Sequence, residues 1–126
     1  TILVIEGYNK ALGTLNSIEK ISLQDKSTEL FDIKIPISLR RLASLKISET
    51  RIMIMGGLTK LCKESDHVYC LDVEKKNIIK FTSLPKGGIL DHEIILDEIG
   101  NVHLFFENNY GTSPPIHHTY NYLDFN

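Results

Sequence analysis

The stretch Arg51-Ile-Met-Ile-Met-Gly-Gly57 is an apolar strand pattern that ends in two glycines. Fifty residues earlier the chain reads Thr1-Ile-Leu-Val-Ile-Glu-Gly7, and fifty residues later it reads Asn101-Val-His-Leu-Phe-Phe-Glu107. A fixed internal period is the signature of a repeat architecture, and it decides the fold before any single element is assigned.

Three further runs recur with the same period, and each is rich in β-branched and aromatic residues. They are Ser17–Leu23 with His67–Val73 and, after a slip of one or two residues, His118–Asp124; Leu30–Pro36 with Ile79–Pro85; and Leu42–Ile47 with His92–Asp97. Gly, Asn, Asp and Ser separate the runs, which indicates short strands joined by tight turns. We therefore expect an all-β chain with four antiparallel strands in each complete period. The continuous apolar run Ile52–Met55 favours a strand that is buried on both faces, as in a sheet held between two others.

The period around Gly56-Gly57 resembles a kelch repeat. In that family an apolar strand ends in Gly-Gly, and a second apolar strand ends near Asp, as Val68–Asp72 does here. A Leu-Pro close follows, as in Ser83-Leu84-Pro85, and a period near 50 residues is typical of the family. The chain departs from the pattern at Glu6-Gly7 and Phe106-Glu107, which replace the glycine pair, and it contains no Trp.

The resemblance implies a partial kelch-type β-propeller of about two and a half four-stranded antiparallel blades. We assign residues 1–36 to a partial blade, 37–86 to a complete blade and 87–126 to a partial blade. Because a closed propeller takes about 4–8 blades, we expect the chain to be a segment that more of the same chain, or another chain, completes. A glycine pair at a strand end permits positive φ and close backbone approach. The structural motif residues are Gly7, Gly56, Gly57, Asp72 and Pro85.

Composition narrows the classes of function. The 14 basic and 16 acidic side chains give a net charge of −2, so nothing favours nucleic acid or an anionic membrane surface as a partner. No apolar run approaches the roughly 20 residues of a membrane span. The cysteines, Cys62 and Cys70, are too few for a disulfide scaffold, and we expect free thiols in a reducing compartment.

We therefore expect a non-enzymatic protein-interaction scaffold in the cytoplasm that belongs to a large assembly, cytoskeletal or ciliary. The alternatives are the substrate-recognition propeller of a ubiquitin-ligase adaptor and, less favoured, a propeller enzyme with a metal or sugar site. Long loops are expected over Tyr8–Asn16, Leu58–Asp66 and Asn109–Ile116, where binding residues would gather on one face. The residues predicted to bind partners are Tyr8, Lys60 and Tyr110.

Other candidate sites favour structural explanations, and we expect no cofactor and no metal. His117 and His118 are adjacent in a predicted strand and so point to opposite faces, which is poor chelating geometry; a site would need His92 or His103 as well. The acidic cluster Asp91, Glu93, Asp97 and Glu98 precedes Gly100 and is typical of a solvated turn. Cys62 lies between Lys60 and Lys63, which could lower its pKa, but no catalytic partners are evident.

Overall fold

The computed structural model describes residues 2–11, 13–85, 87, 92–106 and 116–121, and all their regular secondary structure is β-strand. Within these residues there is no helix with the length and apolar character to cross a membrane. The strands are β1 (Ile2–Asn9), β2 (Gly13–Ile21), β3 (Thr28–Leu30), β4 (Leu39–Arg40), β5 (Ala43–Lys46), β6 (Arg51–Met55), β7 (Leu58–Thr59), β8 (Val68–Asp72), β9 (Asn77–Lys80), β10 (His92–Leu96), β11 (Asn101–Phe106) and β12 (Ile116–Asn121).

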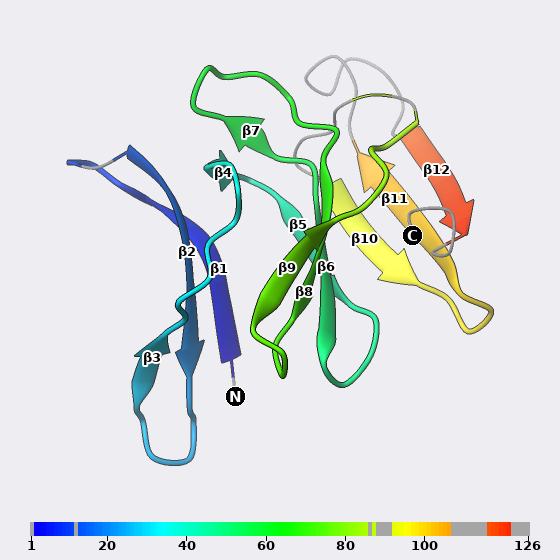
Figure 1. The fold of residues 1–126 in the computed structure, drawn as a ribbon. Helices are drawn as coiled ribbons and strands as arrows, with labels where there is room; N and C mark the ends of the chain where they lie inside the picture. Colours follow the sequence, from blue (N-terminus) through cyan, green and yellow to red (C-terminus); the bar gives the residue numbers. More distant parts are fainter. Residues whose placement is uncertain (1, 12, 86, 88–91, 107–115, 122–126) are drawn as a thin grey trace.

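The strands form antiparallel sheets that follow one another along the chain. The first sheet has the order β1-β2-β3, the central sheet β5-β6-β8-β9 and the third sheet, in its described part, β10-β11-β12. A small sheet pairs β4 with β7. Figure 1 shows the central sheet, in green tones, standing between the blue first sheet and the yellow-to-red third sheet. The all-β, antiparallel class predicted from the sequence is therefore confirmed.

Strand pairing repeats with the predicted period of 50 residues. The equivalent pairs include Ile2–Ile21 with Ile52–Leu71, Ile5–Ile18 with Met55–Val68, Glu19–Leu30 with Tyr69–Lys80, and Ala43–Met55 with Glu93–Phe105. Between β11 and β12 the register slips by one residue, because Val102 pairs with Tyr120 rather than with Asn121. A one-residue slip exchanges the two faces of a strand, so it decides which histidines of β12 share a face with those of β11.

The central sheet is buried on both faces, as its continuous apolar strands predicted. All five residues of β8 are buried, and alternate side chains point to opposite faces. One face meets the first sheet through residues such as Ile54, Tyr69 and Leu71, which pack with Ile18. The other face meets the third sheet in a second apolar cluster. Its buried members are Met53, Met55, Val68, Leu84, Val102 and Leu104.

Segments that end each repeat differ from the prediction. We expected strands over 30–36 and 79–85, but β3 ends at Leu30 and β9 at Lys80, and the residues that follow are irregular. Phe31 N–H donates to Ile18 O at 2.9 Å, and Phe81 N–H donates to Val68 O at 2.8 Å, so each chain segment still follows the neighbouring strand. Phe31 is buried in the core beside the first sheet. The alternating apolar residues in these segments therefore pack into the core from irregular backbone and do not form strands.

The predicted loop over Tyr8–Asn16 is wrong. β1 continues to Asn9 and β2 begins at Gly13, and Tyr8 pairs with Thr14 across this hairpin. Tyr8 therefore stands in a strand and not in a long loop.

Candidate functional site

The glycine pair at the end of β6 brings two chain segments into close contact. Gly56 has φ 70° and Gly57 has φ 96°, which are left-handed conformations that L side chains rarely adopt. A Cβ on Gly57 would lie 2.9 Å from Arg40 O and 3.1 Å from Leu42 Cβ. Gly57 therefore has the positive φ and close backbone approach that the sequence suggested, and it fixes the small β4-β7 sheet beside the central sheet.

The segment 58–66 forms the most extended described connection between strands of the central sheet. Its base is held by Ser65 N–H, which donates to Gly57 O at 2.8 Å, and by the bridge between Leu58 and Glu64. Lys60 is exposed at its turn. A hollow of about 590 Å³ runs along the loop. It is lined by Ile37, Ser38, Thr59, Lys60, Leu61, Lys63, Glu64, Ser65, Asp66 and His67.

Cys62 lies at the tip of this loop with φ 58° and is exposed. Its Sγ is 3.8 Å from Nη2 of Arg40. Cys70, in contrast, is buried in β8, and burial raises the pKa of its thiol. Both cysteines are free, as predicted, and a raised pKa keeps the Cys70 thiol protonated and unreactive at neutral pH.

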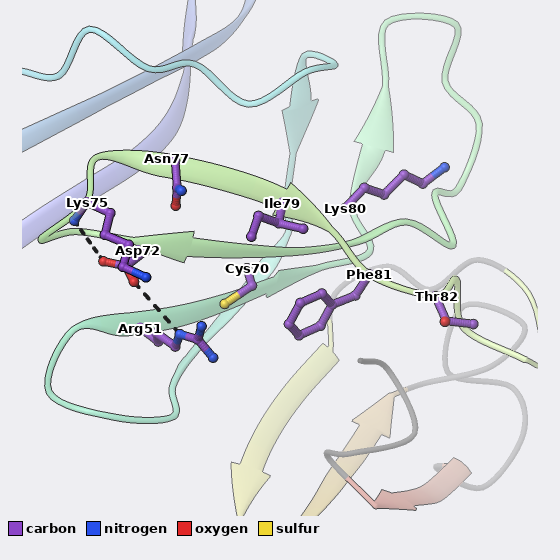
Figure 2. A pocket seen from close by; sticks show the side chains of 9 residues that line it. All are labelled: Arg51, Cys70, Asp72, Lys75, Asn77, Ile79, Lys80, Phe81 and Thr82. Carbon is purple, nitrogen blue, oxygen red and sulfur yellow. Dashed lines mark hydrogen bonds and ion pairs between the residues drawn. The ribbon is translucent and has the colours of Figure 1, made fainter.

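Asp72 organises the turn between β8 and β9. It is buried, and its Oδ1 accepts hydrogen bonds from the backbone N–H groups of Glu74 at 3.1 Å and Lys75 at 2.9 Å. Its Oδ2 lies 3.8 Å from Nε of Arg51. Figure 2 shows the contacts of Asp72 with Lys75 and Arg51. These residues and Cys70 line a pocket of about 260 Å³. Asp72 thus has a structural role in this turn.

The other motif residues occupy less constrained places. Gly7 lies in β1 next to a register shift between Ile5 and Gly7. Pro85 is exposed in a turn directly after the buried Leu84. The Tyr8 side chain and the whole of Tyr110 lie outside the described residues, as do Asp91 and the His92 side chain. Of the three residues predicted to bind partners, only the Lys60 side chain can be placed, and it borders the hollow along 58–66.

The acidic cluster lies partly in a turn, as expected. Asp97 Oδ1 accepts hydrogen bonds from the N–H groups of Ile99 at 3.0 Å and Asn101 at 2.9 Å in the β10–β11 connection. Its Oδ2 is 2.8 Å from Nε2 of His103, and this hydrogen bond is the main cause that lowers the pKa of Asp97. Glu93 and Glu98 are exposed.

Sequence reasoning missed a contact between histidines from β11 and β12. Nδ1 of His103 lies 3.0 Å from Nε2 of His117, whereas His118 contacts the hydroxyl of Tyr120. The adjacent pair His117-His118 is thus divided between two faces of β12, as predicted, and His103 is the partner of His117. The slip expected from the sequence aligned His118 with His67, whereas the observed pairing makes Ile116 the equivalent of His67, so the expected alignment is wrong and did not bring His103 and His117 together.

Comparison with models of known protein families gives no match, and comparison with curated proteins gives none either.

Proposed function

We propose that the chain is an arc of a kelch-type β-propeller and acts as a non-enzymatic protein-interaction scaffold in a large intracellular assembly, cytoskeletal or ciliary. In this proposal the first, central and third sheets are successive blades over 1–36, 37–86 and 87–126. The contact between β5 and β10, the leading strands of adjoining sheets, supports an arrangement in which leading strands gather at an axis.

One observation carries the proposal: the outer sheets expose positions whose equivalents are buried in the central sheet. Val4 of the first sheet is equivalent to Ile54, yet Val4 is 40% exposed and Ile54 is 0% exposed. Phe105 of the third sheet is equivalent to Met55, yet Phe105 is 38% exposed and Met55 is 0% exposed.

The exposed side chains gather on the outward faces. Ile2 and Leu30 lie on the same face of the first sheet as Val4 and are also exposed. Ile2 is two residues before Val4 in β1, and Leu30 pairs with Glu19, which is itself the partner of Val4. Contiguous exposed apolar residues on a sheet mark a surface that another element covers. The central sheet meets the first and third sheets through Ile54 and Met55, the equivalents of Val4 and Phe105. We therefore propose that further sheets of the same repeat cover both outward faces.

The loop 58–66 is the proposed site for a different partner. The loop begins directly after Gly57, and the hydrogen bond from Ser65 N–H to Gly57 O holds its base. Loops on a rigid scaffold commonly carry binding residues. Lys60 and Lys63 lie beside Glu64 and Asp66 along its hollow, so the surface offers both signs of charge to a protein partner. This mixed character favours a protein surface over a polyanion.

A paired stability measurement tests the covered-face proposal. The double variant Ile2→Lys/Val4→Lys, at positions equivalent to Ile52 and Ile54, is made both in this 126-residue chain and in the longest natural chain that contains it. In the short chain both positions are exposed, so the free energy of unfolding should change by less than about 0.5 kcal/mol. In the longer chain or its assembly, two lysines buried without partners should cost more than about 3 kcal/mol or dissociate the complex.

Ile99→Lys is the matched control, because Ile99 is 80% exposed at the β10–β11 turn and lies on no sheet face. Its effect should be small in both chains. Sedimentation of the protein isolated from its source tests the scaffold function itself: we expect a particle much larger than the chain. A free monomer with no stable partner would overturn the scaffold, and equal small effects of the double variant in both chains would overturn the covered face.

A further inference from the structure

The outward face of the third sheet carries a polar network where the equivalent face of the central sheet is apolar. Asp97, His103 and His117 lie in line across the β10–β11 turn, β11 and β12. Nε2 of His103 is 2.8 Å from Oδ2 of Asp97, and Nδ1 of His103 is 3.0 Å from Nε2 of His117. The equivalents of β11 and β12 in the central sheet bury Met and Val side chains at these positions.

The carboxylate determines which nitrogen of His103 is free to bind an ion. Because Asp97 accepts a hydrogen bond from Nε2–H, the neutral His103 ring carries its proton there and leaves the lone pair of Nδ1 unprotonated. His117 then donates Nε2–H to that lone pair. A histidine that donates one ring N–H to a carboxylate and binds a metal through its other nitrogen is the usual arrangement of metal-ligating histidines.

The two nitrogens have a spacing that one metal ion can bridge. Zinc–nitrogen bonds are about 2.0–2.1 Å, so two tetrahedral nitrogen ligands lie about 3.3 Å apart. The observed 3.0 Å is close to this value, and both rings turn out of their hydrogen-bonded alignment so that their lone pairs converge on the ion. Oγ1 of Thr119 lies 3.3 Å from Nε2 of His117, so a hydroxyl that can hydrogen-bond to a metal-bound water borders the same place.

Packing orients the His117 ring before any ion arrives. The ring stacks on Phe105, its direct cross-strand partner, with centroids 4.4 Å apart and an interplanar angle of 6°. His103 is likewise held, by Asp97. Pre-orientation of both ligands reduces the conformational entropy that binding must overcome.

We propose that His103 and His117 form a binding site for a divalent transition metal ion of the Zn²⁺, Ni²⁺ and Cu²⁺ group, with Asp97 as the carboxylate that orients His103. Imidazole nitrogen is the ligand that these ions share, and it disfavours Mg²⁺ and Ca²⁺. The ion replaces the proton between the rings. His117 moves that proton from Nε2 to Nδ1, so both rings remain neutral.

The site supplies two nitrogens and leaves the other coordination positions to water in this chain. No described cluster of three or more His, Cys, Asp or Glu side chains is arranged for a metal. The open positions point away from the third sheet, toward the face that the proposed function assigns to a further sheet. The metal site does not depend on that proposal, because both ligands belong to this chain.

Calorimetric titration of the purified chain with ZnCl₂, NiCl₂ or CuCl₂ tests the inference. A Cys62→Ser background removes the exposed thiol, which would otherwise compete for the ion. We expect one ion per chain and tightest binding of Cu²⁺. His103→Gln and His117→Gln should each abolish this binding, and Asp97→Asn should weaken it by about 10- to 100-fold.

His118→Gln is the matched control, since it removes the neighbouring histidine from the opposite face of β12 and should leave the affinity unchanged. Paramagnetic broadening by Ni²⁺ should be strongest at the amides of β11 and β12 around His103 and His117, and should extend to the adjoining part of β10 and the β10–β11 turn. Urea unfolding of each variant separates loss of binding from loss of the fold. Binding that survives the double variant His103→Gln/His117→Gln, or that His118→Gln weakens as much as His117→Gln does, would overturn the site.

Discussion

Replacement of Gly57 by Ala tests the close approach that fixes the β4-β7 sheet. The substitution has two separable costs. At φ 96° an alanine is in a left-handed conformation, which costs about 1–2 kcal/mol. Its Cβ also lies 2.9 Å from Arg40 O, a backbone atom that can retreat only if β4 moves, and such overpacking costs about 1–3 kcal/mol. We therefore expect Gly57→Ala to lower the free energy of unfolding by about 2–5 kcal/mol.

Gly100→Ala isolates the first cost, that of the left-handed conformation. Gly100 has φ 88°, close to that of Gly57, but a Cβ there has nothing within 4 Å. It should therefore lose only the conformational component of about 1–2 kcal/mol. Both variants are compared by urea unfolding monitored by circular dichroism, and amide exchange of β4 and β7 should accelerate only in Gly57→Ala. Equal losses of stability in the two variants would refute the reasoning.

Three further perturbations address the turns and the core. NMR titration should find the pKa of Asp25 at about 2, below the usual 3.8, because the Ser27 hydroxyl and N–H donate hydrogen bonds to its carboxylate. The resulting stabilisation of the fold is present above about pH 4 and is lost as the pH falls toward 2. Ser27→Ala should raise the pKa of Asp25. Asp72→Ala should lower the free energy of unfolding by about 1–3 kcal/mol, while Asp72→Asn, which keeps an acceptor oxygen, should retain most of it, as measured by urea unfolding. Met53→Ala should cost about 2–5 kcal/mol, because Met53 is fully buried, whereas Ile79→Ala, at 50% exposure, should cost less than half as much in the same assay.

The sequence was sufficient to predict the repeat and its consequences for packing. A period of 50 residues specified both the strand pairing and the equivalence of sheets, because side-chain direction in a strand depends only on register. The continuous apolar strand β6 indicated burial on both faces, and the structure places its Ile54 and Met55 in different apolar clusters.

The sequence does not show where a strand ends when the alternation of apolar residues continues past its end. Phe31 and Ile35 have the spacing of residues on one face of a strand, yet they pack into the core from an irregular segment. The shape of the space between the sheets determines this conformation, and a local pattern does not contain that information. The hairpin that contains Tyr8 was mistaken for a loop, because Asn and Gly, here Asn9 and Gly13, are typical of loops and also occur at the ends of paired strands.

The candidate sites also divide into those that a local pattern determines and those that depend on long-range strand pairing. The roles of Gly57 and Asp72 follow from local turn chemistry, which the sequence carries. The contact between His103 and His117 depends on a one-residue slip in the pairing of β11 with β12, and no local pattern determines that slip. Long-range register is therefore where prediction from this sequence ends.

The most direct test of the central claim is an experimental structure of the longest natural chain that contains these residues. We predict further four-stranded antiparallel sheets of the same register on both sides, with the side chains of Val4 and Phe105 buried against them. Outward faces that remain in solvent, or that are covered by helices, would contradict the account.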